Sequence, residues 1–145
     1  MSWMIEKDLW RQVCERHFRN VQPRKRIRKS IGEDLRNVLS RHRCLVYGCG
    51  TIAELILMNL EGCDIDLCSG LSEEVHRTFR GKTVLAMDEI HPQRYERIII
   101  SPIGYEEQII TSHFQDLFHR SPEKIVLLER AGTSISEEIV VKSRE

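Results

Sequence analysis

The spacing of hydrophobic positions changes near residue 43, and this change divides the chain into two parts. Before it, apolar residues recur every three or four positions over 3–19 and over 31–40, which predicts two amphipathic helices. A dense basic run, 24–29, lies between them. We therefore expect residues 1–42 to form a helical N-terminal extension rather than a domain.

From residue 43 onward, short apolar runs alternate with helical patterns, which is typical of parallel strands joined by helical crossovers. The consecutive isoleucines of Arg97–Ser101 fit a central strand that is buried on both faces. The strands are expected at 44–47, 64–68, 81–85, 97–101 and 124–128, and the helices at 52–60, 72–79 and 105–118. The pattern predicts an α/β domain over 43–130, a Rossmann-like three-layer sandwich with a mostly parallel sheet. Residues 131–145 are expected to form either a loose tail or an edge strand.

Length and composition agree with one packed domain. The 145 residues leave room for a single core with an extension, and 41% of them are hydrophobic while 30% are charged. No apolar run reaches the roughly 18 residues that a membrane span needs, and the N-terminus lacks a secretory pattern. We expect a cytoplasmic protein without a membrane partner.

The zero net charge hides an uneven distribution. Residues 1–43 carry 12 Lys/Arg against 5 Asp/Glu, whereas residues 44–145 carry 10 against 17. The two parts should attract each other or a second subunit, and the apolar N-terminal helix favours a homodimer. The basic run 24–29 lacks interleaved aromatic residues, so a solvated linker or a docking stripe is favoured over a nucleic-acid interface.

The cysteines predict neither a metal site nor a disulfide framework. Their number is odd, no two form a Cys-x-x-Cys pair, and the histidines are scattered. We expect reduced and mostly buried thiols. The five are Cys14, Cys44, Cys49, Cys63 and Cys68.

A glycine-rich turn joins the first expected strand of the domain to the helix after it. It fits the pattern G-x-G-x-x-A and consists of Gly48, Cys49, Gly50, Thr51, Ile52 and Ala53. Such a turn aims backbone N–H groups and the positive end of the helix dipole at one point, which suits a phosphate. The alternative is a tight strand-to-helix turn without a ligand.

The ends of two further strands should lie beside this turn. A dinucleotide site favours an acidic residue at the end of the second strand, where this chain has Ser69 and Gly70. Asp66 lies earlier in that strand. At the end of the fourth strand, Ser101 can supply a hydroxyl and Tyr105 a stacking ring or a hydrogen bond, although Tyr105 can equally be a packing residue.

Residues 45–128 resemble the small Rossmann-like nucleotide-binding domains of bacterial surface-sugar pathways. These include the N-terminal domain of PglD-type sugar acetyltransferases, the cofactor half of nucleotide-sugar dehydratases and the C-terminal domain of some sugar C-methyltransferases. The segments that carry the resemblance are 46–50, 81–84, 87–90, 95–101, 105–109 and 123–126.

The resemblance implies a nucleotide or nucleotide-sugar bound across the glycine turn and the ends of the second and fourth strands, with NAD(P) as a further candidate cofactor. The family usually carries an Asp where Ser69 and Gly70 stand, which leaves the identity of the nucleotide open. The acetyltransferase's repeat-built catalytic domain and the dehydratases' Tyr-x-x-x-Lys pair are absent from the sequence.

The sequence contains no complete catalytic constellation. Cys49 lies near a helix N-terminus, where a thiol can become reactive, but a small residue tolerated in the turn is the favoured interpretation. Glu73 and Glu74 fit the acidic first turn of a helix. The leading hypothesis is a binding or regulatory domain for a nucleotide or nucleotide-sugar in carbohydrate metabolism. The alternatives are a structural or interaction protein that has lost its ligand, and a small S-adenosylmethionine- or NAD(P)-dependent enzyme completed at a dimer interface.

Overall fold

The computed structural model describes residues 28–60, 62–133 and 135–143. The helix expected at 3–19 and the first part of the basic run lie outside these ranges. In the described residues, no helix is both long and apolar enough to span a bilayer.

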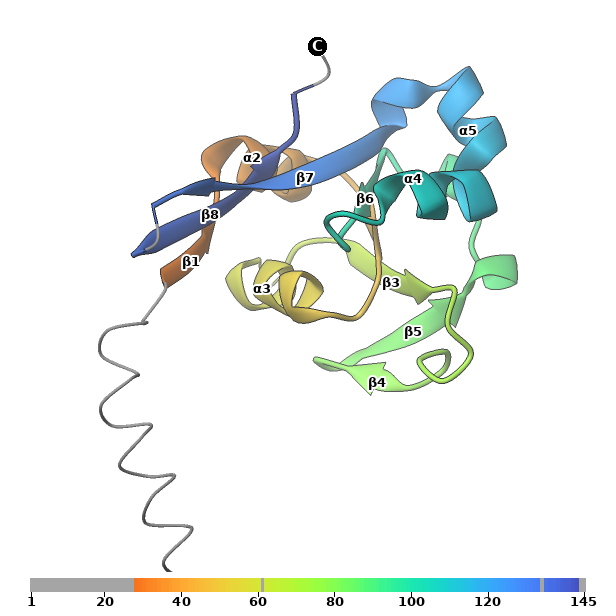
Figure 1. Ribbon diagram of the computed structural model, residues 1–145. Coiled ribbons are helices and arrows are strands. Elements are labelled where there is room, and N and C mark those ends of the chain that lie inside the picture. The colour runs from red at the N-terminus through yellow and green to blue at the C-terminus, as the bar shows by residue number, and fades with distance from the viewer. Residues whose placement is uncertain (1–27, 61, 134, 144–145) are drawn as a thin grey trace, which may run out of the picture.

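One curled, mixed sheet of eight strands forms the centre of the described α/β structure (Figure 1). Its spatial order is β1-β8-β7-β6-β2-β3-β5-β4. The strands are β1 (Arg28–Ile31), β2 (Cys44–Tyr47), β3 (Ile65–Ser69), β4 (Thr78–Phe79), β5 (Lys82–Ala86), β6 (Arg97–Ile100), β7 (Ile125–Gly132) and β8 (Ser136–Val141). Neighbours from β5 to β7 pair in parallel, as do β1 and β8. The pairs β4–β5 and β7–β8 are antiparallel.

The helices lie on both sides of this sheet (Figure 1). They are α2 (Glu33–Arg41), α3 (Thr51–Asn59), α4 (Glu106–Ile109) and α5 (Gln115–Arg120). A π-helical turn over Ile110–Phe114 joins α4 to α5, so the helix expected at 105–118 is present but locally widened. Short 3-10 turns cover Met87–Glu89, Pro92–Arg94 and Pro122–Lys124.

Alternating residues of β2 belong to two separate hydrophobic clusters. Cys44 and Val46 pack with α2 and α3, whereas Leu45 and Tyr47 pack with the segment from α4 to the π-helical turn. Both faces of the strand are therefore buried, as the continuous apolar run Cys44–Tyr47 requires.

The helix expected at 72–79 is wrong. Residues 72–76 form turns, and a hairpin follows in which β4 pairs with β5. Two consecutive positive φ angles, 53° at Arg80 and 79° at Gly81, make the tight turn of this hairpin. His76 also has a positive φ of 65°, which a continuous right-handed helix does not allow.

Both ends of the described chain join the same part of the sheet. The sequence pattern did not predict β1, which pairs with β8. The C-terminal segment forms β8, which has a neighbour on each side and is therefore neither the loose tail nor the edge strand that the sequence offered as alternatives. Helix α2 packs between these strands and the core, where Leu35 and Leu39 are completely buried.

Substituting Leu35→Ala should lower the free energy of unfolding by about 2–5 kcal/mol, because it leaves a cavity between α2 and the sheet. The matched control is Arg36→Ala on the exposed side of the same helix, which should change it by no more than about 0.5 kcal/mol. Urea denaturation followed by circular dichroism measures both values. Equal stability of the two variants would contradict the packing of α2.

Candidate functional site

The glycine turn begins where β2 meets its two neighbours. The backbone N–H of Gly48 donates to the carbonyl of Cys68 in β3 over 2.9 Å. On the other side, Ser101 donates to the Tyr47 carbonyl twice, from its backbone N–H (3.1 Å) and from its Oγ (2.6 Å). The last residue of β2 is therefore held on both sides before the chain turns.

Gly48 permits this close approach. Its φ is +105°, and a Cβ at this position would lie 2.7 Å from Ser101 Oγ. Gly50 differs, since its φ is −90° and a Cβ there would have no atom within 4 Å. The fold therefore requires a glycine at position 48, whereas the absence of a side chain at Gly50 leaves the surface of the turn open.

Helix α3 presents unpaired backbone donors at the end of this turn. Its first intrahelical hydrogen bond runs from the N–H of Glu54 to the carbonyl of Gly50 over 3.0 Å. No side chain in the described part of the chain caps the helix, so the N–H groups of residues 51–53 have no helical or capping partner. These groups and the helix dipole form a centre of positive potential.

A cavity of 460 Å³, here called the turn cavity, opens at the glycine turn and reaches Gly50, the residue that precedes α3. It is bounded by the glycine turn and by the segments that follow β3 and β6. Its lining residues are Tyr47, Gly48, Cys49, Gly50, Ser69, Leu71, Glu74, Pro102, Tyr105, Gln108 and Ile109. None of these is Lys, Arg or His, so an anion in the turn cavity would depend on backbone donors.

Five of the residues expected from the sequence line the turn cavity: Gly48, Cys49, Gly50, Ser69 and Tyr105. Tyr105 is 61% exposed and lies at the rim.

The other five surround the turn cavity without lining it. Thr51 starts α3 with an exposed side chain, and Ile52 and Ala53 pack into the core. Ser101 is buried behind Gly48. A Cβ on Gly70 would lie 2.6 Å from both Tyr47 Oη and His113 Nε2. A glycine at this position therefore leaves space for the ring of Tyr47 and for His113 of the π-helical turn, which packs against it.

Glu74 is the lining residue whose environment the sequence reasoning missed. Instead of standing in the first turn of a helix, its Oε1 accepts a hydrogen bond of 2.6 Å from Ser69 Oγ. The same hydroxyl oxygen accepts the backbone N–H of Leu71 over 3.0 Å, and Ser69 is only 2% exposed. The loop after β3 therefore carries an acid to the end of that strand.

Burial raises the pKa of the Cys49 thiol to about 11, and the charge of Glu74 adds to the rise. A reactive thiolate at the helix N-terminus is not supported, because the thiol is protonated at neutral pH. Cys44, Cys49, Cys63 and Cys68 are all free, as expected for reduced thiols.

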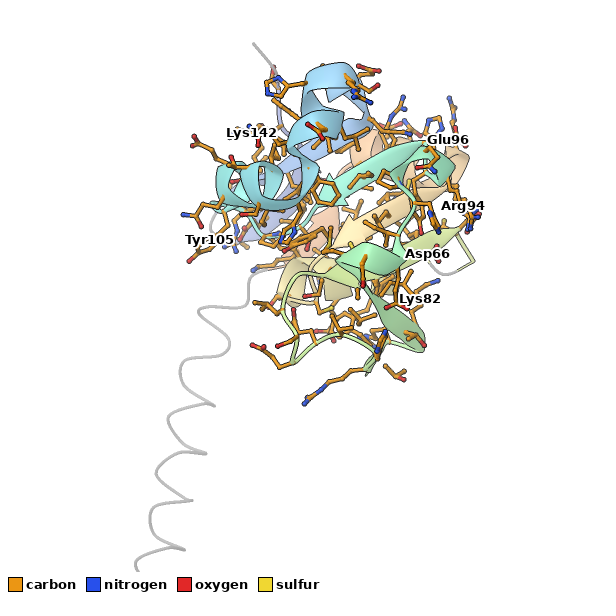
Figure 2. All side chains as sticks on the ribbon, turned by 90° about the vertical axis from the view of Figure 1, so that its right-hand side faces the viewer. Asp66, Lys82, Arg94, Glu96, Tyr105 and Lys142 are labelled. Atoms are coloured by element: carbon orange, nitrogen blue, oxygen red, sulfur yellow. The ribbon has the colours of Figure 1, made fainter. Side chains whose placement is uncertain are left out.

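Asp66 lies at the opposite end of the strands from the turn cavity. Its carboxylate accepts a hydrogen bond of 2.7 Å from Tyr95 Oη and lies 3.7 Å from the Arg43 guanidinium. Figure 2 shows Asp66 and Tyr105 on opposite sides of the molecule. Asp66 therefore cannot supply the acid of the turn cavity.

A larger cavity of 610 Å³ lies beyond the C-terminal end of α3, lined by residues that include Met58, Arg80 and Lys82. None of its lining residues belongs to the glycine turn or to a helix N-terminus. Across the described ranges, no group of three or more His, Cys, Asp and Glu side chains is arranged to hold a metal ion. The turn cavity remains the better candidate site.

No protein-family model, curated protein sequence or solved structure matches this chain significantly. Its function must be inferred from its own geometry.

Gly48→Ala should destabilise the fold by about 1–3 kcal/mol, because Ala is strained at φ +105° and its Cβ would collide with Ser101 Oγ. Gly50→Ala is the matched control and should stay within about 0.5 kcal/mol of the original chain. Chemical denaturation measures both. If the two substitutions cost the same, the different roles assigned to the two glycines are wrong.

Alkylation of Cys49 by iodoacetamide should be about a hundredfold slower in the folded protein than in the urea-unfolded chain at the same pH. The reason is the rise in pKa from 9.0 to about 11, which lowers the thiolate fraction about a hundredfold. The rate should increase tenfold per pH unit as pH approaches 11. Peptide mapping by mass spectrometry follows Cys49 separately from the other thiols. Rapid alkylation at pH 7 would restore the reactive-thiolate hypothesis.

Proposed function

We propose that the turn cavity binds the phosphate groups of a nucleotide or nucleotide-sugar, and that the chain acts as a binding or regulatory domain in carbohydrate metabolism. The observation that carries this proposal is the cavity itself, which lies against the uncapped N-terminus of α3. Backbone N–H groups at such a terminus bind phosphate without a cationic side chain.

The strand order supports this position for a ligand. The segment β5-β3-β2-β6-β7 is parallel throughout, and β2 lies between β3, which follows it in the chain, and β6, which comes later. The connections that leave β2 and β6 pack on opposite faces of the sheet. A crevice then opens at the carboxyl ends of the strands, where ligands of Rossmann-like folds bind. The same order supports a Rossmann-like three-layer arrangement for this part of the chain.

The rest of the cavity suits the less charged parts of a nucleotide. Leu71, Pro102 and Ile109 supply apolar surface, and Gln108 supplies an amide at the rim. A protein that had lost its ligand would be expected to fill this space with the side chain of Cys49 or Ile52 or with the N-terminal helices. Ile52 packs into the core instead, and Cys49 lines a cavity that is still open. The helix expected at 3–19 lies outside the described residues. The resemblance to sugar-pathway domains supports the choice of nucleotide and nucleotide-sugar ligands.

Calorimetric titration with UDP, UDP-glucose, CMP, NAD, NADP and S-adenosylmethionine tests the proposal. At least one phosphate-containing ligand should bind with a 1:1 stoichiometry. Gly50→Ala should weaken that binding at least tenfold, because its methyl group occupies the surface that phosphate would approach, while leaving stability unchanged. The control is Arg36→Ala on α2, which should bind like the original chain. Failure of every ligand to bind would disprove the proposed function.

A further inference from the structure

A second cavity of 220 Å³ adjoins the turn cavity. Its lining residues are Cys49, Glu73, Glu74, Arg77, Thr78, Phe79 and Val84. Cys49 and Glu74 line both cavities. A ligand with its phosphates at the glycine turn can therefore extend over these two residues toward the hairpin formed by β4 and β5.

Glu74 is held at the junction in a defined orientation. The nearly buried Ser69 hydroxyl binds Oε1, and Ser69 is itself fixed by the Leu71 N–H. In the described part of the chain, Oε2 has no hydrogen-bond or ion-pair partner, which leaves it free to accept from a ligand hydroxyl. Glu74 also adds to the rise in the pKa of Tyr47, which burial causes, so its charge acts on two walls of the turn cavity.

The far side of the second cavity is apolar. Phe79 and Val84 both pack against the core cluster that contains α3, and Phe79 retains a partly exposed side chain. An aromatic ring beside an aliphatic residue suits the flat face of a nucleobase. The two cavities thus present three chemistries in order: backbone donors, a carboxylate and an apolar surface.

We propose that Glu74 binds the ribose hydroxyls of a nucleoside diphosphate whose base lies in the second cavity against Phe79. This inference rests on the proposed function, since it requires the phosphates to occupy the glycine turn. It makes Glu74 a determinant of ligand specificity, because a carboxylate accepts hydrogen bonds from a vicinal diol but repels a further phosphate on the ribose.

Binding of four probes tests the proposal: ADP, UDP, 2′,3′-dideoxy-ADP and inorganic pyrophosphate. ADP or UDP should bind more tightly than pyrophosphate, and removing both ribose hydroxyls should weaken ADP binding about tenfold or more. Glu74→Gln should weaken ADP or UDP binding about tenfold and leave pyrophosphate binding unchanged or slightly stronger. The matched control is Glu107→Gln, which makes the same change of charge at an exposed acid of α4 that lines neither cavity and should preserve all affinities.

The placement of the nucleobase is tested separately with Phe79→Leu, which keeps an apolar side chain packed against the core cluster. It should weaken ADP or UDP binding and leave pyrophosphate binding unchanged. Thermal unfolding of each variant checks that the fold is intact.

The outcomes separate this inference from the proposed function. Equal binding of ADP, its dideoxy analogue and pyrophosphate would retain the phosphate site but overturn the role of Glu74. The role of Glu74 would also be overturned if NADP, which carries a 2′-phosphate, bound more tightly than NAD and if this preference disappeared in Arg77→Gln. If neither pyrophosphate nor any nucleotide binds, both proposals are wrong.

Discussion

The carbonyl group of Tyr47 is the point on which the site depends. It accepts both donors of Ser101, while the next residue donates to Cys68, so the end of β2 is fixed to β6 and β3 together. Three strands meeting this closely leave no space for a side chain at Gly48. The chain must turn sharply, and α3 then begins with its N–H groups facing outward. A fold constraint thus produces the open donors, without requiring any ligand to shape them.

The turn cavity is bordered by groups of opposite charge, the N-terminus of α3 and the carboxylate of Glu74. The helix N-terminus attracts an anion, whereas the carboxylate of Glu74, which is oriented by Ser69, adds a negative charge to the lining of the turn cavity. The Cys49 thiol also lines the turn cavity and remains neutral because burial disfavours its thiolate. This combination suits a ligand whose charged and hydroxyl-bearing parts are distinct. The π-helical turn supports one wall of the cavity, because its residues His113 and Phe114 pack against the ring of the lining residue Tyr47.

The sequence predicted the strands of the parallel region and the glycine turn well, because consecutive apolar residues such as Ile98–Ile100 have few other structures available. It failed at 72–79, where Ser72 and two glutamates resemble a helix start but His76 and Arg80 adopt positive φ angles. Because of that error, the sequence did not predict that Glu74 lies in the turn cavity, since its position depends on the geometry of a loop rather than on hydrophobic periodicity. It also missed β1, since the four residues Arg28–Ile31 gain their strand structure only by pairing with β8. Long-range pairing of this kind leaves no local signal.

The pairing of β1 with β8 determines the order in which parts of the sheet can form while the chain is synthesised. Arg28 is in register with Ser136, so the edge of the sheet cannot close until nearly all of the described chain has been synthesised. At ribosomal rates of about 5–20 residues per second, β1 waits on the order of 5–20 s for its partner. The strands that flank the turn cavity, β2, β3 and β6, all precede β8 in the chain. The strands that flank the turn cavity can therefore begin to pair while β1 still exposes unpaired backbone groups.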